Sequence, residues 1–294
     1  MNNINFMAKI RNAWFEVNNL KSSSKKNLII IGGAEDKKGE KIILNFVADK
    51  FKESEGIMLI ATIATESPNI VIEQYKNIFS SMGIREIKEL RVIEREEAFD
   101  ENNISLVNEA SVIFFTGGDQ LRITSLIGGT PLYDTLQKRS NEGCYFVGTS
   151  AGASVMSDVM IVGGEEEESP KKSTLNMSAG LGLIKNTLID QHFAQRGRIG
   201  RLLSGVCQNP EVLGIGIDED TAIVINDDEL TVIGSGAVYF VDGRNIEYTN
   251  VSEKRQDEVF SIFNIKLHVL TAGKKMNLST RVPFEEERNK NEDK

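Results

Sequence analysis

Cysteine and histidine are scarce in this chain, which has two of each among its 294 residues. Cys144 lies within an apolar run and Cys207 precedes Gln208, so the sequence predicts buried thiols and excludes a disulfide framework. Two separated histidines, with no Cys or His pair at ligand spacing, do not make a familiar zinc site. We therefore expect a protein that uses neither a metal nor an organic cofactor.

Long apolar runs are also absent, because no stretch approaches the roughly 20 residues that cross a bilayer. The segment from Met1 to Lys26 carries Trp14 and Phe15 among polar residues and lacks the apolar core and cleavage site of a signal peptide. We expect a cytoplasmic protein without a membrane partner. The formal charge of −9 argues weakly against nucleic-acid binding and allows a substrate with cationic groups.

Short apolar runs that alternate with amphipathic stretches are the main pattern of the chain. This alternation predicts an α/β fold with a mainly parallel sheet covered by helices on both faces. From Ala222 to Tyr248 short strands alternate with turns, which predicts a C-terminal antiparallel addition. The first three buried strands are expected within residues 27–31, 57–65 and 111–116.

One α/β domain over residues 27–283 accounts for this pattern. It follows an N-terminal extension, residues 1–26, and precedes a charged tail, residues 284–294, that we expect to be disordered. Small residues favour a helix from Ala153 to Met160. Gly32-Gly33 ends the first strand but lacks the remaining glycine of a dinucleotide fingerprint, so a plain turn is favoured there over a cofactor site.

The segment Gly148-Thr149-Ser150-Ala151-Gly152 follows an apolar run and precedes small residues that suit a helix. Strand, sharp turn and helix form a nucleophile elbow, with Ser150 at its tip in a strained backbone conformation. A Cβ at either glycine would collide where the strand and helix backbones approach each other. Such turns also occur without a catalytic role, so the motif alone leaves both interpretations open.

A serine hydroxyl attacks an amide only when a base takes its proton, and the base needs a third group to orient it. His192 lies in a polar segment before a glycine- and arginine-rich turn, where catalytic groups often project, and we predict it to be the base. His268 alternates with apolar residues and indicates a structural strand position.

Glu219 is the predicted orienting acid because it follows a buried strand, and Asp218 and Asp220 are its rivals. The order serine, histidine, acid differs from that of an α/β-hydrolase. Gly118 and Ala151 could donate backbone N–H groups to an oxyanion, although a tight turn explains Gly118 equally well.

Charged clusters occur on either side of the predicted base. Arg196, Arg198 and Arg201 suit capture of carboxylates, and the last two share a helical face; solvated surface arginines are the alternative. The glutamates from Glu165 to Glu168 indicate a solvated loop or a site that recruits a cationic substrate.

Together these segments resemble the cyanophycinases, serine peptidases related to aspartyl dipeptidases of the peptidase E type. Asp-Gln-His-Phe followed by Arg-Gly-Arg is specific to cyanophycinases, whereas Gly-Thr-Ser-Ala-Gly is shared with the dipeptidases. The matching segments are Gly117-Gly118-Asp119-Gln120, Gly148-Thr149-Ser150-Ala151-Gly152-Ala153, Glu167-Glu168-Ser169-Pro170, Asp190-Gln191-His192-Phe193, Gln195 to Leu202 and Gly216 to Ala222.

The resemblance implies a flavodoxin-like or class I glutamine-amidotransferase-like fold and a homodimer. It implies that Ser150 is the nucleophile, His192 the base and Glu219 the orienting acid. The substrate would be cyanophycin, a poly-aspartate with arginine on each β-carboxylate, cleaved to β-Asp-Arg dipeptides. The implied substrate-binding residues are Gln120, Asp190, Gln191, Arg196, Arg198 and Arg201.

Two other functions stay open at this point. A dipeptidase for aspartyl or isoaspartyl peptides would share the elbow, and a non-catalytic binder of arginine-rich polymer would share the pocket. The N-terminal extension, the charged tail and Lys171-Lys172, where an arginine was expected after the proline, depart from the family pattern.

Overall fold

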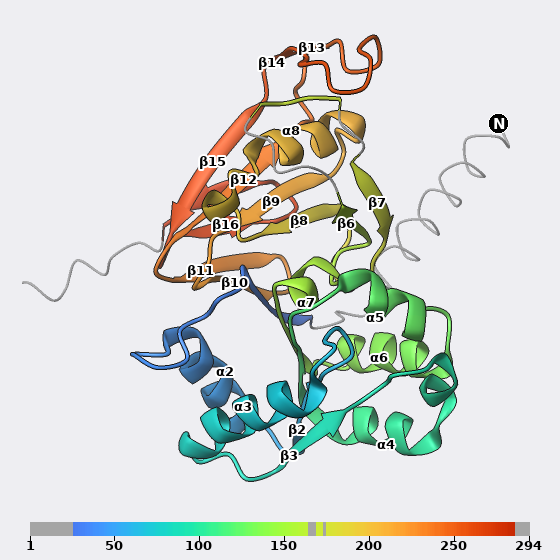
Figure 1. Ribbon diagram of the computed structural model, residues 1–294. Helices are drawn as coiled ribbons and strands as arrows, with labels where there is room; N and C mark the ends of the chain where they lie inside the picture. Colours follow the sequence, from blue (N-terminus) through green and yellow to red (C-terminus); the bar gives the residue numbers. More distant parts are fainter. Residues whose placement is uncertain (1–25, 164–168, 173–174, 286–294) are drawn as a thin grey trace, which may run out of the picture.

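The computed structural model describes residues 26–163, 169–172 and 175–285. The predicted parallel strands form one half of a nine-stranded sheet (Figure 1). All but the edge strand have largely apolar, buried sequences, which suit strands that are covered on both faces. In spatial order they are β1 (Asn27–Ile31), β5 (Tyr145–Thr149), β4 (Ala110–Phe115), β2 (Ile57–Ala61) and β3 (Ile87–Leu90).

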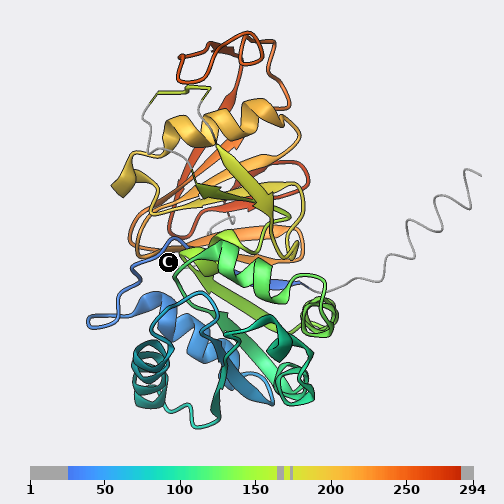
Figure 2. The same cartoon turned by 45° about the vertical axis from the view of Figure 1, so that its right-hand side comes forward.

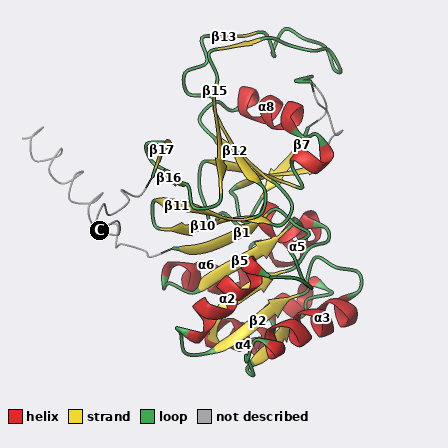
Figure 3. Ribbon diagram, turned by 90° about the vertical axis from the view of Figure 1, so that its left-hand side faces the viewer, coloured by secondary structure: helices red, strands yellow, loops and turns green. Residues whose placement is uncertain are grey.

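Helices cover both faces of this half, as predicted (Figure 3). Ile29 and Ile31 of β1 pack in the core of one face with α2 (Ile42–Lys52) and α3 (Pro68–Ser81). Leu28 and Ile30 point to the other face, because successive strand side chains alternate. The helices of that second face are α4 (Glu101–Glu109), α5 (Gln120–Ile127) and α6 (Pro131–Asn141), and a short 3-10 helix, η1 (Arg95–Phe99), precedes them.

The other half of the sheet is antiparallel and begins beside β1. Leu28 is opposite Ile225 in this first antiparallel pair. The predicted C-terminal addition is therefore confirmed. Its strands are β10 (Thr221–Asn226), β11 (Glu229–Gly234), β16 (Lys275–Asn277) and β17 (Val282–Phe284).

A separate four-stranded sheet, which the sequence pattern did not indicate, lies above the nine-stranded sheet in Figure 2. Leu202 and Val206 of α8 (Ile199–Gln208) pack on it against Leu188 and Val241. Its strands, in spatial order, are β15 (Lys266–Thr271), β12 (Ala237–Asp242), β9 (Leu213–Ile217) and β8 (Thr187–Gln191). Two short hairpins complete the strands: β6 (Val159–Gly163) with β7 (Asn176–Ala179), and β13 (Tyr248–Thr249) with β14 (Ile262–Phe263).

Two boundaries differ from those predicted. The helix expected from Ala153 to Met160 is only α7 (Ala151–Ser154), because the β-branched run from Val159 forms β6. Phe284, expected in the tail, ends β17. Residues 1–25, the Glu165–Glu168 loop and residues 286–294 lie outside the described part of the chain. Among the described residues, no helix is long and apolar enough to cross a membrane.

Candidate active site

Ser150 occupies the sharp turn between β5 and α7. Its φ of 54° and ψ of −113° are unusual for a residue with a side chain, as predicted for the tip of an elbow. A Cβ on Gly148 would lie 2.2 Å from the carbonyl oxygen of Gly152, and a Cβ on Gly152 would lie 2.2 Å from that of Phe115. The two glycines therefore allow the close backbone approach that fixes Ser150 at the carboxyl end of the sheet.

Ser150, His192 and Glu219 form a continuous chain of contacts. Ser150 Oγ lies 3.0 Å from His192 Nε2, and His192 Nδ1 lies 2.6 Å from Glu219 Oε1. The His192 side chain is 13% exposed, so the ring is largely shielded but can still be reached. This geometry allows the imidazole to take the serine proton while the carboxylate holds the ring in one tautomer.

His192 follows β8 and also has a positive φ, 49°. Its backbone N–H donates to the Gly32 carbonyl at 2.8 Å. Gly33, with a φ of 98°, packs against the imidazole, and a Cβ there would come within 2.4 Å of the ring. The turn after β1 therefore helps to fix the direction of the base.

Glu219 lies in the turn between β9 and β10, and its backbone N–H donates to Gln195 Oε1 at 3.1 Å. Its two predicted rivals bond elsewhere. Asp218 accepts from the Ala194 N–H at 3.0 Å, and Asp220 accepts from the Asp36 N–H at 2.8 Å. Glu219 is thus the carboxylate of this turn that contacts the histidine.

The turn of Gly117 and Gly118 lies beside the elbow. A Cβ on Gly117 would lie 3.4 Å from that of Ser150, and a Cβ on Gly118, whose φ is 143°, would lie 2.1 Å from the Ala64 carbonyl oxygen. Gly117 thus lies beside Ser150, Gly118 follows Gly117 in the chain, and the buried Ala151 follows Ser150. That the backbone N–H groups of Gly118 and Ala151 form an oxyanion hole stays a prediction.

Asp190, Arg198 and Arg201 form a buried cluster below the His192 turn. The Asp190 side chain is 1% exposed, and the two arginine side chains are 6% and 7% exposed. Arg201 binds both oxygens of Asp190, with Nε 2.6 Å from Oδ2. Arg198 Nη1 lies 3.4 Å from Asp190 Oδ1 and donates to the Gln191 carbonyl at 2.5 Å. Arg198 directly precedes α8 and Arg201 lies in its first turn, and both side chains turn inward onto Asp190.

The other predicted pocket residues lie on three different elements. Arg196 is exposed in the 3-10 helix η2 (Ala194–Arg196), and the buried Gln191 ends β8. Gln120 begins α5, and its Nε2 donates to the Ile161 carbonyl at 2.7 Å.

A buried carboxylate behind the elbow was missed from the sequence. Glu35 is 3% exposed and accepts hydrogen bonds from Tyr75 OH at 2.5 Å and from Thr149 Oγ1 at 2.6 Å. The available signal was the segment Gly32-Gly33-Ala34-Glu35-Asp36 at the carboxyl end of the first strand, which we interpreted as a plain turn.

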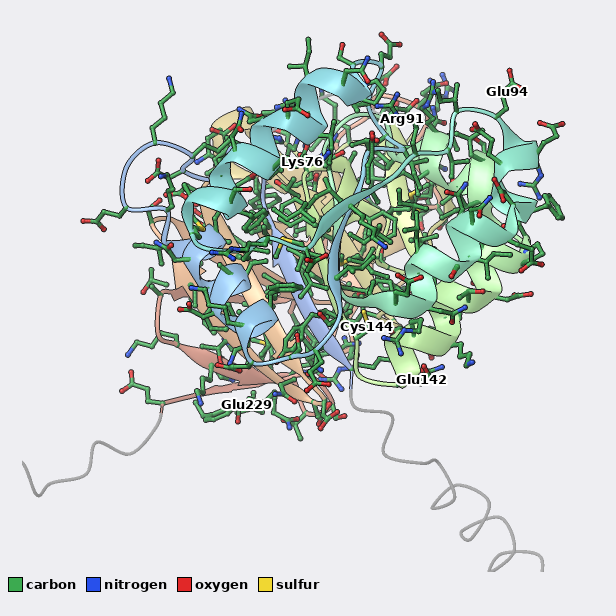
Figure 4. All side chains as sticks on the ribbon, turned by 90° about the horizontal axis from the view of Figure 1, so that it is seen from below. Lys76, Arg91, Glu94, Glu142, Cys144 and Glu229 are labelled. Carbon is green, nitrogen blue, oxygen red and sulfur yellow. The ribbon has the colours of Figure 1, made fainter. Side chains whose placement is uncertain are left out.

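The cysteine thiols are poor candidates for the nucleophile. Cys144 lies at the start of β5 near Glu142 (Figure 4), and burial raises its pKa to about 12. Burial likewise raises the pKa of Cys207 to about 11. Both thiols are therefore protonated at neutral pH, and a thiol is a much weaker nucleophile than a thiolate. Within the described residues, no group of three or more His, Cys, Asp or Glu side chains is placed to hold a metal ion.

A serine, a histidine and a carboxylate joined at an elbow are the arrangement of a serine hydrolase. The model of "Peptidase family S51" matches residues 28–233, and the chain belongs to this family of serine peptidases. The chain is 40% identical over 267 residues to "Cyanophycinase" of Geminocystis herdmanii, which covers 90% of this chain and 98% of the relative. It is 38% identical over 261 residues to "Cyanophycinase" of Synechococcus elongatus, with 88% and 81% covered.

A solved structure supports the fold. A crystal structure of a peptidase from an acI-B1 Actinobacterium aligns with a TM-score of 0.64 at 21% sequence identity. The alignment covers 87% of this chain and 98% of that peptidase. The α/β architecture with a mainly parallel central sheet is thus shared with a known peptidase.

Proposed function

We propose that this chain is a cyanophycinase, a serine-type exopeptidase that hydrolyses cyanophycin to β-Asp-Arg dipeptides. The observation that carries this proposal is the chain of contacts from Ser150 through His192 to Glu219. The substrate is suggested by the cyanophycinase relatives, which match along nearly the whole chain. The net charge of −9 is compatible with a polymer that carries many guanidinium groups.

In the proposed mechanism, His192 takes the Ser150 proton as Oγ attacks the scissile backbone carbonyl of the polymer. The C–N bond then breaks, His192 gives the proton to the leaving amine, and an acyl ester remains on Ser150. Water, activated by the same imidazole, hydrolyses the ester. Backbone N–H groups of Gly118 and Ala151 stabilise the oxyanion, and each such donor contributes roughly 3–4 kcal/mol to the transition state.

We assign substrate contacts to Gln120, Gln191, Arg196 and Arg198. Planar guanidinium groups suit the free carboxylate of each arginine on the polymer. Asp190 and Arg201 also belong to the predicted binding set, but each uses its charge on the other. We therefore propose that they hold Arg198 and the His192 turn in place, and that Asp190 does not contact a substrate guanidinium. The homodimer and the cytoplasmic location remain predictions.

Mass spectrometry of the products from purified cyanophycin tests the activity. We expect the mass of β-Asp-Arg from the wild type. We expect Ser150→Ala and His192→Ala to lower kcat by roughly 10³-fold or more, because the members of such a triad act as a unit. The matched control is His268→Ala, which changes the histidine of β15 and should keep wild-type turnover.

Dipeptide release by Ser150→Ala at the wild-type rate would exclude the mechanism. If the wild type does not cleave cyanophycin but cleaves aspartyl or isoaspartyl dipeptides, cyanophycin is not its substrate. Labelling of the wild type, but not of Ser150→Ala, by a fluorophosphonate would argue against a non-catalytic binding protein.

A further inference from the structure

The turn after β1, residues 32–36, is hydrogen-bonded to His192 and to a residue next to each of the other two members of the proposed triad. Its Gly32 carbonyl accepts from the His192 N–H at 2.8 Å, and its Gly33 carbonyl accepts from the Asp220 N–H at 2.9 Å. Asp220 directly follows Glu219 in the chain. The base and the orienting acid are thus both tied to one short turn.

The third connection runs through the side chain of Glu35. Oε2 of Glu35 accepts from Thr149 Oγ1 at 2.6 Å, and Thr149 immediately precedes Ser150. Thr149 itself is 4% exposed, so water does not compete for this hydrogen bond.

Glu35 is itself firmly held. Its Oε1 accepts from Tyr75 OH at 2.5 Å and lies 2.7 Å from Lys37 Nζ. The Tyr75 ring packs on Phe114, with ring centroids 4.7 Å apart. The carboxylate is therefore a fixed acceptor between helix α3 and the end of β5.

The charge state of Glu35 suits this role. Burial opposes ionisation, but the charge of Lys37 and the hydrogen bonds from Lys37, Thr149 and Tyr75 outweigh it and lower the Glu35 pKa. Burial and the Glu35 charge raise the pKa of Tyr75 well above its ordinary value, so the phenol stays a donor. A buried carboxylate is costly unless its partners are all present, so all three donors are needed.

We infer that Glu35 is a positioning residue for the nucleophile, which it holds through the Thr149 hydroxyl, and that residues 32–36 join the three triad members into one rigid unit. This inference rests on the proposed function, because it assumes that Ser150 is the nucleophile. It explains the Gly-Gly-Ala-Glu-Asp sequence without a bound cofactor. A displacement of about 1 Å at a reacting atom can lower the rate roughly 100-fold. We therefore expect loss of the hydrogen bond between Glu35 and Thr149 to lower kcat.

The test removes the hydroxyl and then restores it. Thr149→Val keeps the side-chain shape but breaks the bond to Glu35, and we expect kcat and the rate of fluorophosphonate labelling of Ser150 to fall roughly 10- to 100-fold. KM should stay within about twofold, because Thr149 is buried and is not one of the assigned substrate contacts. Thr149→Ser should restore both rates, since serine supplies the same hydroxyl.

Two further variants change the acceptor Glu35 and its other hydrogen-bond partner, Tyr75. Glu35→Met, whose side chain cannot accept this hydrogen bond, should lower the labelling rate as Thr149→Val does, and Tyr75→Phe, which removes only the hydrogen bond on the far side of Glu35, should lower it less. The control is Thr187→Val, a buried threonine at the start of β8 whose hydroxyl has no hydrogen-bond partner among the described residues. It should label at the wild-type rate.

The outcomes separate this inference from the proposed function. Wild-type labelling and kcat in folded Thr149→Val, or an equal loss in Thr149→Ser, would overturn the positioning role and leave Ser150 as the nucleophile. If Thr149→Val fails to fold, unchanged labelling of folded Glu35→Met overturns the role instead. Absence of labelling in the wild type would overturn both proposals.

Discussion

At the scale of single residues, the strained turn at Ser150 depends on the absence of side chains at the two nearby glycines. Gly148 and Gly152 have no Cβ, and each position brings backbone atoms within 2.2 Å of where one would stand. The turn can therefore hold a positive φ at a serine, which exposes Oγ to His192. The surrounding strand and helix keep this conformation in place.

Glu219 provides the prediction at this scale. Glu219→Gln removes the negative charge 2.6 Å from His192 Nδ1, so we expect kcat to fall roughly 10²- to 10⁴-fold while the fold stays intact. Asp218→Asn is the control, because Asp218 accepts from the Ala194 and Ala237 N–H groups and should affect Tm more than kcat. Steady-state kinetics and thermal unfolding separate the two effects. Wild-type kcat in Glu219→Gln would remove Glu219 from the proposed triad.

The contacts of Ser150, His192 and Glu219 could be foreseen because each residue follows a recognisable strand in a recognisable motif. Glu35 could not be foreseen in the same way. Its partners Tyr75 and Thr149 are 40 and 114 positions away in the chain, so the bond exists only after the sheet has formed. A lone glutamate after two glycines carries no local sign of burial.

At the scale of elements, the start of α8 is fixed to the end of β8 by the buried pair of Asp190 and Arg201. The arginine pattern predicted a shared helical face but not its direction. That direction depends on α8 packing against the separate four-stranded sheet, which no local periodicity specifies. The short α7 has a local origin instead, since Ser157 Oγ lies 3.0 Å from the Ser154 carbonyl and 2.7 Å from that of Val159 and stabilises the turn into β6.

The Asp190–Arg201 pair gives a prediction for these elements. Asp190→Asn leaves the buried Arg201 and Arg198 without their carboxylate, and Arg201→Gln removes the bidentate partner of the buried Asp190, so we expect each to lower the free energy of unfolding by about 3–5 kcal/mol. The double variant should lose less than the sum of the two, because both single variants remove the same Asp190–Arg201 interaction. Urea unfolding of the four proteins measures this coupling. A raised KM with unchanged stability would instead indicate that Asp190 contacts the substrate.

At the scale of the whole molecule, the nine-stranded and four-stranded sheets are joined by charged side chains as well as by the core. Asp242 ends β12 of the smaller sheet, and its Oδ1 lies 2.7 Å from Nη1 of Arg281, which precedes β17 of the larger one. The parallel half of the molecule was predictable from alternating strands and helices. The division into two sheets was not, because strand patterns do not specify which strands pair.

The ion pair between Asp242 and Arg281, which connects the two sheets, is sensitive to acid. Burial opposes ionisation of Asp242, but hydrogen bonds from Arg244 and Arg281 prevail and lower its pKa from 3.8 to about 2. A folded-state pKa below the unfolded value stabilises the protein above about pH 4, and this stabilisation is lost as the pH falls toward 2. We expect Asp242→Asn to lower the free energy of unfolding at pH 7 by about 2 kcal/mol and by about half as much at pH 3. Urea unfolding at both values checks this, with Glu229→Gln, a half-exposed carboxylate paired with Lys275, as a control of little effect. The two pH values should give different losses of unfolding free energy only if the Asp242 carboxylate is ionised in the folded state. If the loss is equal at pH 7 and pH 3, the Asp242 charge does not link the sheets.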